Sequence, residues 1–344
     1  MIVLGAPFAG ALIDRYGLKR TATLSLILYA CLFFVFTKMN GTLWMYYLLS
    51  MMTAIVALPS TPIGFTRAIN AWFHKNKGKA LGICLTSTGL SAFLLPKFVT
   101  PYVAAHGWRP AVEILALIIL AAVPFIWFLI KDRPDTALHG NHPTNIESGL
   151  TLREASRSKI FWNLALVFLL ISISIVGLIP SFIPMLQDAG LEAGLVGSYA
   201  AILGASVMIG RLLTGVLIDY IFAPRVVAVV FTLVAIGCFL LGCGVVQYAI
   251  FGAIALGLGI GAEVDLIGYF TAKYFGLRHY GSIYGAMYSI FSLGAILSPT
   301  IAGFIWDKTG DYKMALFLAT GLIAIAIVLA FFLPRFPARY NEAL

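Results

Sequence analysis

Three ionisable residues stand inside long apolar runs of the sequence: Arg211, Glu263 and Asp265. A charge in lipid is costly, so such a residue usually faces a water-filled cavity or an opposite charge. An arginine fork binds a carboxylate through two parallel hydrogen bonds, and a buried carboxylate can carry a proton. We therefore take these residues as candidates for a solute site. The hydroxyl groups that a polar solute would meet beside them belong to Tyr269, Tyr284 and Tyr288.

Each charged candidate also has a purely structural interpretation. Arg211 lies two helical turns before Asp219, so it can instead belong to contacts near the end of its span, paired with Asp219 or a neighbour. Glu263 and Asp265 lie about 200° apart around a helix, so at most one of them faces a cavity squarely. Either carboxylate can serve as a structural partner of a basic residue, namely Arg211, Lys273 or Arg278.

A glycine run precedes the two carboxylates, at Gly257, Gly259 and Gly261. A dinucleotide-binding loop requires a strand before such a run, and here the whole segment is apolar and long enough to be a membrane span. The run therefore predicts close packing between helices.

The composition indicates a membrane protein. The chain has 344 residues, of which 61% are hydrophobic and 11% charged, whereas soluble domains carry about 25% charged residues. The apolar runs are unbroken and approach the ~20 residues that a helix needs to cross a bilayer, which excludes the alternating pattern of a barrel. These features exclude a soluble enzyme, a disordered chain and a disulfide scaffold. The predicted fold class is an all-α polytopic membrane protein.

Eleven spans are expected, the first of them incomplete. They cover residues 1–13, 21–38, 44–66, 79–104, 110–131, 160–185, 194–222, 226–246, 248–271, 280–306 and 313–333. Most of the 23 basic residues fall in alternate loops, starting with the loop from Asp14 to Arg20. Because short cytoplasmic loops retain Lys and Arg, this asymmetry predicts that those loops and the C-terminus are cytoplasmic. The basic residues left for the outer side are Lys38, Lys97, Arg109, Lys308 and Lys313.

The chain repeats itself. Residues Gly10–Asp14 match Gly215–Asp219, and four residues of a later segment find counterparts 203 positions further on. These four pairs are Gly78 with Gly281, Gly82 with Gly285, Pro96 with Pro299 and Gly107 with Gly310. A parallel repeat of this kind is typical of two-halved transporters. The predicted organisation is a first half over 1–131, a cytoplasmic linker over 132–159 and a second half over 160–344.

The repeat also bears on the first helix of the first half. In the second half a whole span and part of the next precede Asp219, whereas only 13 residues precede Asp14. By comparison of the two halves, about 45 residues at the start of the second half have no counterpart in the first half. We therefore expect the sequence to be N-terminally truncated relative to the complete two-halved fold.

The segment from Gly10 to Arg20 closely resembles the signature between the second and third helices of the major facilitator superfamily. Together with the repeat and the central linker, the resemblance covers the whole chain. It implies two six-helix halves that rock around one solute site near the middle of the membrane. It also implies a gating latch that stabilises the outward-open state. By this resemblance the latch residues are Gly10, Asp14, Arg15, Gly17 and Arg20, with Gly215 and Asp219 in the second copy.

Further segments are similar to the monocarboxylate porters and the oxalate/formate antiporters of that superfamily. They are Trp72–Phe73 with the basic run after it, Gly78–Gly82, Gly107–Arg109 and Gly303–Tyr312. The resemblance implies that Arg211 binds a carboxylate. In the monocarboxylate porters an aspartate lies one turn before this arginine, whereas here the position is Val207. That departure leaves open how a proton would be coupled through this helix.

The expected function is a secondary active transporter that moves a small organic anion, such as a monocarboxylate, either with protons or in exchange. An exporter of drugs or hydrophobic solutes and a non-transporting sensor or paralogue remain alternatives. No Walker, metalloprotease, Cys-x-x-Cys or nucleophile-elbow motif is present, so no enzymatic activity, cofactor or metal is expected. The expected partners are the solute and the lipid bilayer, without nucleic acid. We expect a monomer in the cell membrane, or the inner membrane of a bacterium.

Overall fold

The structure is a computed structural model that describes residues 2–73, 76–131 and 149–337. Its first half consists of six α-helices and one 3-10 turn. These elements are α1 (Ile2–Tyr16), α2 (Leu18–Thr37), α3 (Leu43–Ala57), η1 (Leu58–Ser60), α4 (Pro62–Trp72), α5 (Lys77–His106) and α6 (Trp108–Leu129).

The second half begins with a short helix and continues with seven longer ones. These are α7 (Leu152–Ser156), α8 (Lys159–Ile175), α9 (Leu178–Asp188), α10 (Ala193–Tyr220), α11 (Ala223–Cys243), α12 (Val245–Phe275), α13 (Tyr280–Thr309) and α14 (Lys313–Phe331).

Each of the eleven predicted spans corresponds to a helix or a broken helix. Among the described residues, nine stretches are long and apolar enough to cross a membrane. The helix α1 has 15 residues and is therefore about 22 Å long, short of the ~30 Å hydrocarbon core. Two spans are interrupted, since α3 and α4 are separated by η1 and α8 ends just before α9. The all-α polytopic prediction is confirmed.

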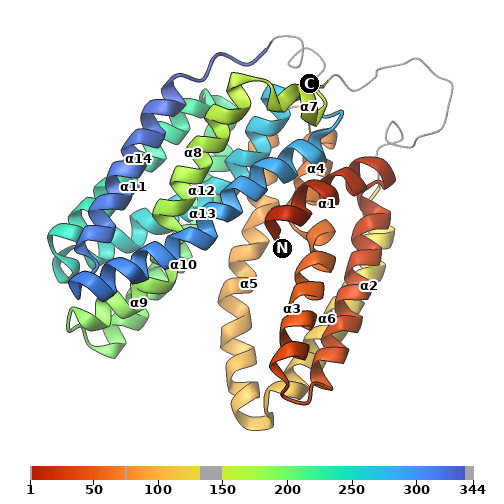
Figure 1. Ribbon diagram of the computed structural model, residues 1–344, viewed down its shortest axis with the longest axis horizontal. Coiled ribbons are helices and arrows are strands. Elements are labelled where there is room, and N and C mark those ends of the chain that lie inside the picture. Colours follow the sequence, from red (N-terminus) through yellow and green to blue (C-terminus); the bar gives the residue numbers. More distant parts are fainter. Residues whose placement is uncertain (1, 74–75, 132–148, 338–344) are drawn as a thin grey trace.

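The two halves converge at one end of the bundle and diverge towards the other (Figure 1). The end where they meet carries α7, and we call it the α7 end. There α1 of the first half lies along α13 of the second, and α5 lies along α10. Because α1 corresponds to α10 and α5 to α13 in the repeat, these two contacts are related by pseudo-symmetry.

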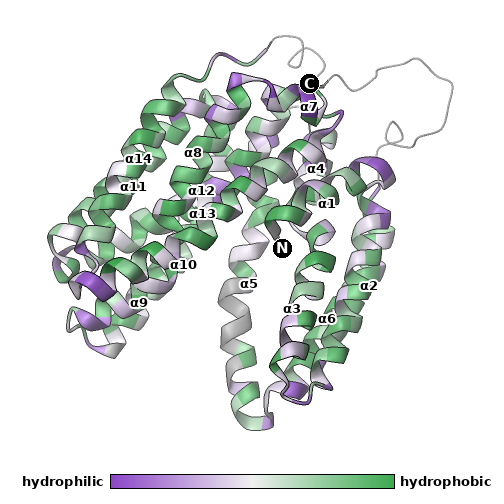
Figure 2. Cartoon of the chain, viewed as in Figure 1, coloured by the Kyte–Doolittle hydropathy of each residue, from purple (hydrophilic) through white to green (hydrophobic). Residues whose placement is uncertain are grey.

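Hydrophobic residues occur along most of the length of the helices (Figure 2). Large exposed hydrophobic residues occur along most of the long helices, for example Phe128 on α6 and Phe331 on α14. A soluble protein rarely exposes so much contiguous apolar surface. This surface matches a hydrocarbon environment.

The halves differ in how their interiors are filled. In the second half α8 packs against both α13 and α14. Among the described residues of the first half, no helix takes the equivalent position between α5 and α6. Large side chains of the first half, such as Ile83 on α5 and Ile118 on α6, are exposed.

The predicted linker lies outside the described residues over 132–148. The described residues that follow include the short helix α7, which the sequence did not predict. The Leu150 N–H donates to the Phe275 carbonyl at 2.8 Å, and α7 begins at a capping box in which Thr151 and Glu154 bond reciprocally. This connection ties α7 to the end of α12.

Candidate functional site

A buried ion pair joins two helices of the second half. Arg211 on α10 donates from Nη1 to Oδ1 of Asp265 on α12 at 3.2 Å. Arg211 is 8% exposed and Asp265 is fully buried. Nε of Arg211 and Oδ2 of Asp265 have no hydrogen-bond partner among the described residues. The pair therefore keeps unused hydrogen-bonding capacity on both sides, which a buried polar group normally does not.

The glycine run brings these helices together. A Cβ on Gly261 would lie 2.4 Å from the Val207 carbonyl oxygen, and one on Gly257 would lie 2.5 Å from the Leu203 oxygen. Gly210 meets the Leu258 carbonyl in the same way from the α10 side. Small residues allow helix backbones to approach closely, so the predicted packing role of the glycines is confirmed. The same close approach lets the side chain of Asp265 reach Arg211.

Glu263 lies on the same stretch of α12 and is 4% exposed. Its Oε2 has no hydrogen-bond partner in the part of the chain that the structure describes. The charges of Arg211 and Asp265 both act on it, although only Asp265 is hydrogen-bonded to the arginine. The cluster thus holds two carboxylates beside one arginine.

Two of the three candidate tyrosines border this cluster from α13. The Tyr284 and Tyr288 rings stack with centroids 6.0 Å apart, and the charge of Arg211 acts on both hydroxyls. The Tyr284 hydroxyl is buried and has no partner among the described residues. Tyr269 lies elsewhere. Its hydroxyl donates to the Ile218 carbonyl at 3.1 Å, at the α7 end, because it follows Asp265 by one helical turn towards that end.

The two predicted gate aspartates bridge the halves at the α7 end. Asp14 accepts from the backbone N–H groups of Gly281 and Ser282, each at 2.9 Å, at the start of α13. Asp219 accepts from the N–H groups of Gly78 at 2.7 Å and Lys79 at 3.0 Å, at the start of α5. A carboxylate at a helix N-terminus satisfies free N–H groups and complements the helix dipole. Each half therefore caps a helix of the other half.

The gate glycines make these caps possible. A Cβ on Gly10 would lie 1.8 Å from the Gly281 carbonyl oxygen. A Cβ on Gly215 would lie 2.4 Å from the Gly78 carbonyl oxygen, and one on Gly78 would lie 2.2 Å from that of Gly215. The backbones of the two halves are thus in direct contact at both places. Any larger side chain would push the halves apart.

The remaining gate residues lie at the turn after α1. Gly17 adopts a φ of 82°, a conformation that favours glycine, and lets α2 start directly after α1. Arg15 is exposed, with its guanidinium 5.3 Å from the Tyr16 ring centroid. Arg20 is exposed and lines an apolar groove between α1, α2 and α3.

One gate contact was not predicted. Nε of Arg67 on α4 lies 3.0 Å from Oδ1 of Asp14, and both side chains are largely buried. The missed signal was its place in an apolar run, since a charge there calls for an opposite charge.

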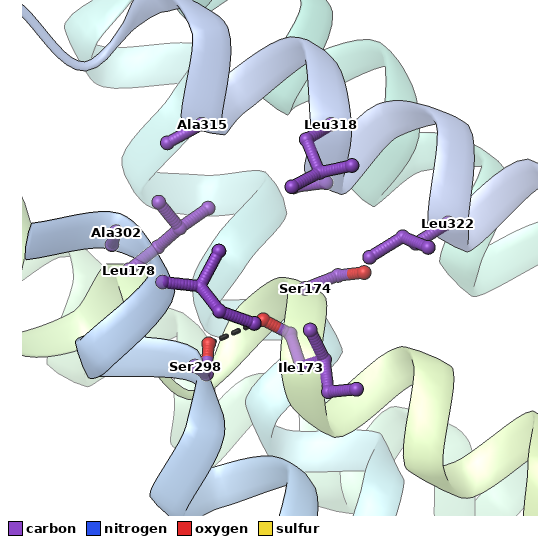
Figure 3. Close-up of a pocket in the computed structure, with 10 residues that line it drawn as sticks. Ile173, Ser174, Leu178, Ser298, Ala302, Ala315, Leu318 and Leu322 are labelled. Atoms are coloured by element: carbon purple, nitrogen blue, oxygen red, sulfur yellow. Dashed lines mark hydrogen bonds between the residues drawn. The ribbon is translucent and has the colours of Figure 1, made fainter. Parts of the chain in front are cut away.

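A small cavity lies where α8 ends, between α13 and α14 (Figure 3). The Ser298 hydroxyl donates to the Ile173 carbonyl and accepts from the Gly177 N–H at 2.8 Å. These bonds satisfy backbone groups that the break between α8 and α9 frees. The cavity measures about 20 Å³ and has room for about one water molecule. The cavity adjoins the break between α8 and α9 and is too small for a solute.

Comparison with known proteins identifies the family. The model of the Major Facilitator Superfamily matches residues 1–299. The chain belongs to this superfamily. It is therefore a multi-pass membrane protein of a transporter family, whose members act on small-molecule solutes. The fucose:proton symporter FucP of E. coli has the same fold, with a TM-score of 0.76 at 17% identity over 97% of this chain and 89% of that one.

Curated relatives with similar sequences include a monocarboxylate transporter and an efflux protein by name. Monocarboxylate transporter 11 of Homo sapiens is 27% identical over 96% of this chain and 72% of that protein. The MFS-type transporter YhjX of Escherichia coli is 24% identical over 86% of this chain and 74% of its own length. The fujikurins efflux protein of Gibberella fujikuroi is 23% identical over 94% of this chain and 69% of its own length.

Proposed function

We propose that this protein is a secondary active transporter that moves a small organic anion, such as a monocarboxylate, by alternating access. The observation that carries the proposal is the buried Arg211, whose Nε has no hydrogen-bond partner among the described residues. A guanidinium binds a carboxylate through two parallel hydrogen bonds. Similarity to monocarboxylate transporter 11 supports the same class of solute.

Asp265 would compete with the solute's carboxylate for Arg211, so that the solute can be both bound and released. It holds Arg211 through Nη1, so an incoming carboxylate must share or displace it. A proton on Asp265 would weaken that hold and keep the cluster's charge in balance when the anion arrives. Glu263 is the second group able to take up a proton in the same cluster. In exchange transport, the departing anion would be replaced by the next one instead.

Tyr284 and Tyr288 complete the proposed site. The charge of Arg211 acts on the Tyr284 hydroxyl, which has no hydrogen-bond partner in the described chain, and a carboxylate oxygen would accept its hydrogen. The stacked rings provide an apolar wall for the solute's hydrocarbon part.

We propose that the α7 end is cytoplasmic and that the protein lies as a monomer in the cell membrane. Support comes from the basic residues, which gather in the loops at this end and near the last described residues. The two caps at Asp14 and Asp219 then hold the cytoplasmic side shut. The halves would rock by breaking both caps and opening this side to the cytoplasm.

Uptake of radiolabelled monocarboxylates into proteoliposomes tests the proposal, with Arg211→Gln as the variant. Arg225→Gln is the matched control, because it removes the same charge from an exposed position at the start of α11. We expect wild-type uptake in the control and at least a ~100-fold loss in Arg211→Gln, since charge-assisted hydrogen bonds contribute roughly 1.5–3 kcal/mol each. Uptake by Arg211→Gln at the control rate would overturn the proposal.

Export of hydrophobic solutes is the second candidate. It is favoured by the aromatic stack on α13, which continues from Tyr280 through Tyr288 to Phe291, and by the resemblance to a fungal efflux protein. An exporter would show transport that is insensitive to Arg211→Gln and inhibited by lipophilic compounds. A well-folded protein that moves neither class of solute would support a non-transporting role.

A further inference from the structure

A second buried cation lies at the contact between the halves, separate from the proposed anion site. Lys77 is the first residue of α5 and is 2% exposed. Its Nζ has no hydrogen-bond partner within the described residues. The neighbouring N–H groups of Gly78 and Lys79 are both taken by the Asp219 carboxylate. The backbone at this helix start is therefore satisfied, while the ammonium group beside it is not.

Within the described residues, no carboxylate forms a hydrogen bond or ion pair with the Lys77 ammonium. Lys273 on α12, which belongs to the other half, acts on Lys77 as a like charge. The Lys79 ammonium is exposed and donates to the Tyr220 hydroxyl at 2.8 Å. The contact between α5 and the second half thus brings the like charges of Lys77 and Lys273 together, while the Asp219 carboxylate accepts from the backbone N–H groups of Gly78 and Lys79.

At the pseudo-symmetric contact, the start of α13, the residue equivalent to Lys77 has its hydrogen-bonding group satisfied. Gly78 corresponds to Gly281, so Lys77 corresponds to Tyr280 at the start of α13. Tyr280 is also fully buried, and its hydroxyl donates to the Gly268 carbonyl at 3.2 Å. The fold therefore accommodates a neutral, hydrogen-bonded residue here, and only the α5 copy places an amine at this point.

An amine that loses its water without gaining a partner opposes the arrangement that buries it. It does so whether it stays charged and unpaired or gives up its proton. The penalty disappears when the halves separate and Lys77 meets water. The other features of this end, namely the two aspartate caps and the glycine contacts, all favour closure.

We propose that the buried Lys77 destabilises the closed arrangement of the α7 end. It thereby offsets part of the stabilisation from the two caps and keeps closure reversible. The halves close against it through Asp14 and Asp219, and they part more readily because Lys77 regains its water. This role depends only on the contact between the halves and does not require the proposed solute.

Distances between spin labels on the two halves test the proposal. The labels are placed by Tyr16→Cys and Ile221→Cys, at exposed and pseudo-symmetric positions at the ends of α1 and α10. Serine replaces the native Cys31, Cys84, Cys238 and Cys243. Double electron–electron resonance then gives the populations of the closed and the open α7 end in the purified, full-length chain without solute.

Lys77→Met removes the amine and keeps a similar length. We expect the closed-to-open ratio to rise by about tenfold or more, because the closed state of this variant no longer buries an unpaired amine. A tenfold change in the ratio corresponds to about 1.4 kcal/mol. The measurement is repeated with Asp219→Asn, which weakens one cap and populates the open state. There Lys77→Met should restore closure. Arg225→Met removes an exposed charge at the start of α11 and should leave the ratio unchanged.

Lys77→Arg separates charge from shape, because it keeps the positive charge and should stay at least as open as the wild type. Size-exclusion profiles and melting temperatures verify that each variant is folded. An unchanged ratio for Lys77→Met in the Asp219→Asn background, or a shift towards the open state, would overturn the proposal. Since no solute is present, that result would leave the proposed anion transport standing.

Discussion

At the scale of single residues, the features that matter are charges placed where water is scarce. Arg211 and Asp265 were recognisable in the sequence because each interrupts an apolar run. Their pairing was one of several possibilities, since Lys273 and Arg278 were equally available to Asp265 by type. The register between α10 and α12 decides the pairing, and it depends on backbone contacts such as Gly261 against Val207.

Gly261→Leu tests this register. Its side chain would meet the Val207 carbonyl oxygen, with Cβ at 2.4 Å, so α10 and α12 must separate. We expect the free energy of unfolding to fall by about 2–4 kcal/mol, seen as a lower melting temperature in detergent. Gly204→Leu on α10 is the control because nothing lies within 4 Å of its Cβ position. Equal stability of the two variants would contradict the close contact.

A second residue-scale prediction concerns the coupling of protons. If Asp265 releases Arg211 by taking up a proton, Asp265→Asn should mimic the protonated state. We expect its solute exchange to persist while proton-driven accumulation falls to background. Exchange and accumulation in proteoliposomes, with and without an imposed pH gradient, measure the two separately. Proton-driven accumulation at the wild-type level would exclude Asp265 as the coupling group.

At the scale of elements, sequence patterns located the helices well and their interruptions poorly. All eleven predicted spans correspond to helices, because a run of about 20 apolar residues leaves few alternatives in a membrane. The breaks at η1 and after α8 were missed. They depend on partners distant in sequence, such as Ser298, which supplies the hydrogen bonds at the end of α8.

The helix α7 was missed for a related reason, since it is short and its anchor lies on α12. Its capping box makes a prediction at this scale. The backbone N–H and hydroxyl of Thr151 hydrogen-bond to Glu154, which lowers the pKa of that carboxyl below its ordinary value. A lowered pKa means that the carboxylate stabilises the folded helix above the ordinary glutamate pKa of about 4.3. This contribution is lost as the pH falls through the lowered pKa.

Hydrogen exchange measured by mass spectrometry, corrected for intrinsic rates, follows α7 directly. We expect the protection of α7 to decline below pH of about 4 in the wild type, and Glu154→Gln to be weaker at neutral pH without a further decline in acid. A wild-type α7 whose protection is the same at neutral pH and in acid would contradict the role of Glu154.

At the scale of the whole molecule, the two halves are held at the α7 end by pseudo-symmetric caps. The sequence repeat predicted the correspondence of Asp14 with Asp219. It did not show that each aspartate caps a helix of the opposite half, because which half a side chain meets depends on how the halves dock. Because both caps join the same two halves, formation of one cap brings the groups of the other cap together.

This coupling predicts the behaviour of cap variants. Asp219→Asn removes the charge at the start of α5 and should cost about 1 kcal/mol of closure, a factor of roughly five in the closed-to-open ratio. Hydrogen exchange of the backbone amides of Gly78 and Lys79 should become faster. The amides of Gly281 and Ser282 should lose protection too, although their own cap at Asp14 is intact. Loss confined to the start of α5 would mean that the caps act independently.

Equilibrium binding of the transported carboxylate to the purified protein tests the central claim most directly. Isothermal titration in buffers of different ionisation enthalpy reports both the affinity and any proton taken up. The wild type and Arg225→Gln should bind with the same affinity. Arg211→Gln should bind at least ~100-fold more weakly, because its amide cannot replace a charged fork. Equal affinity for Arg211→Gln and the wild type would contradict the assignment of Arg211 as the anion-binding residue.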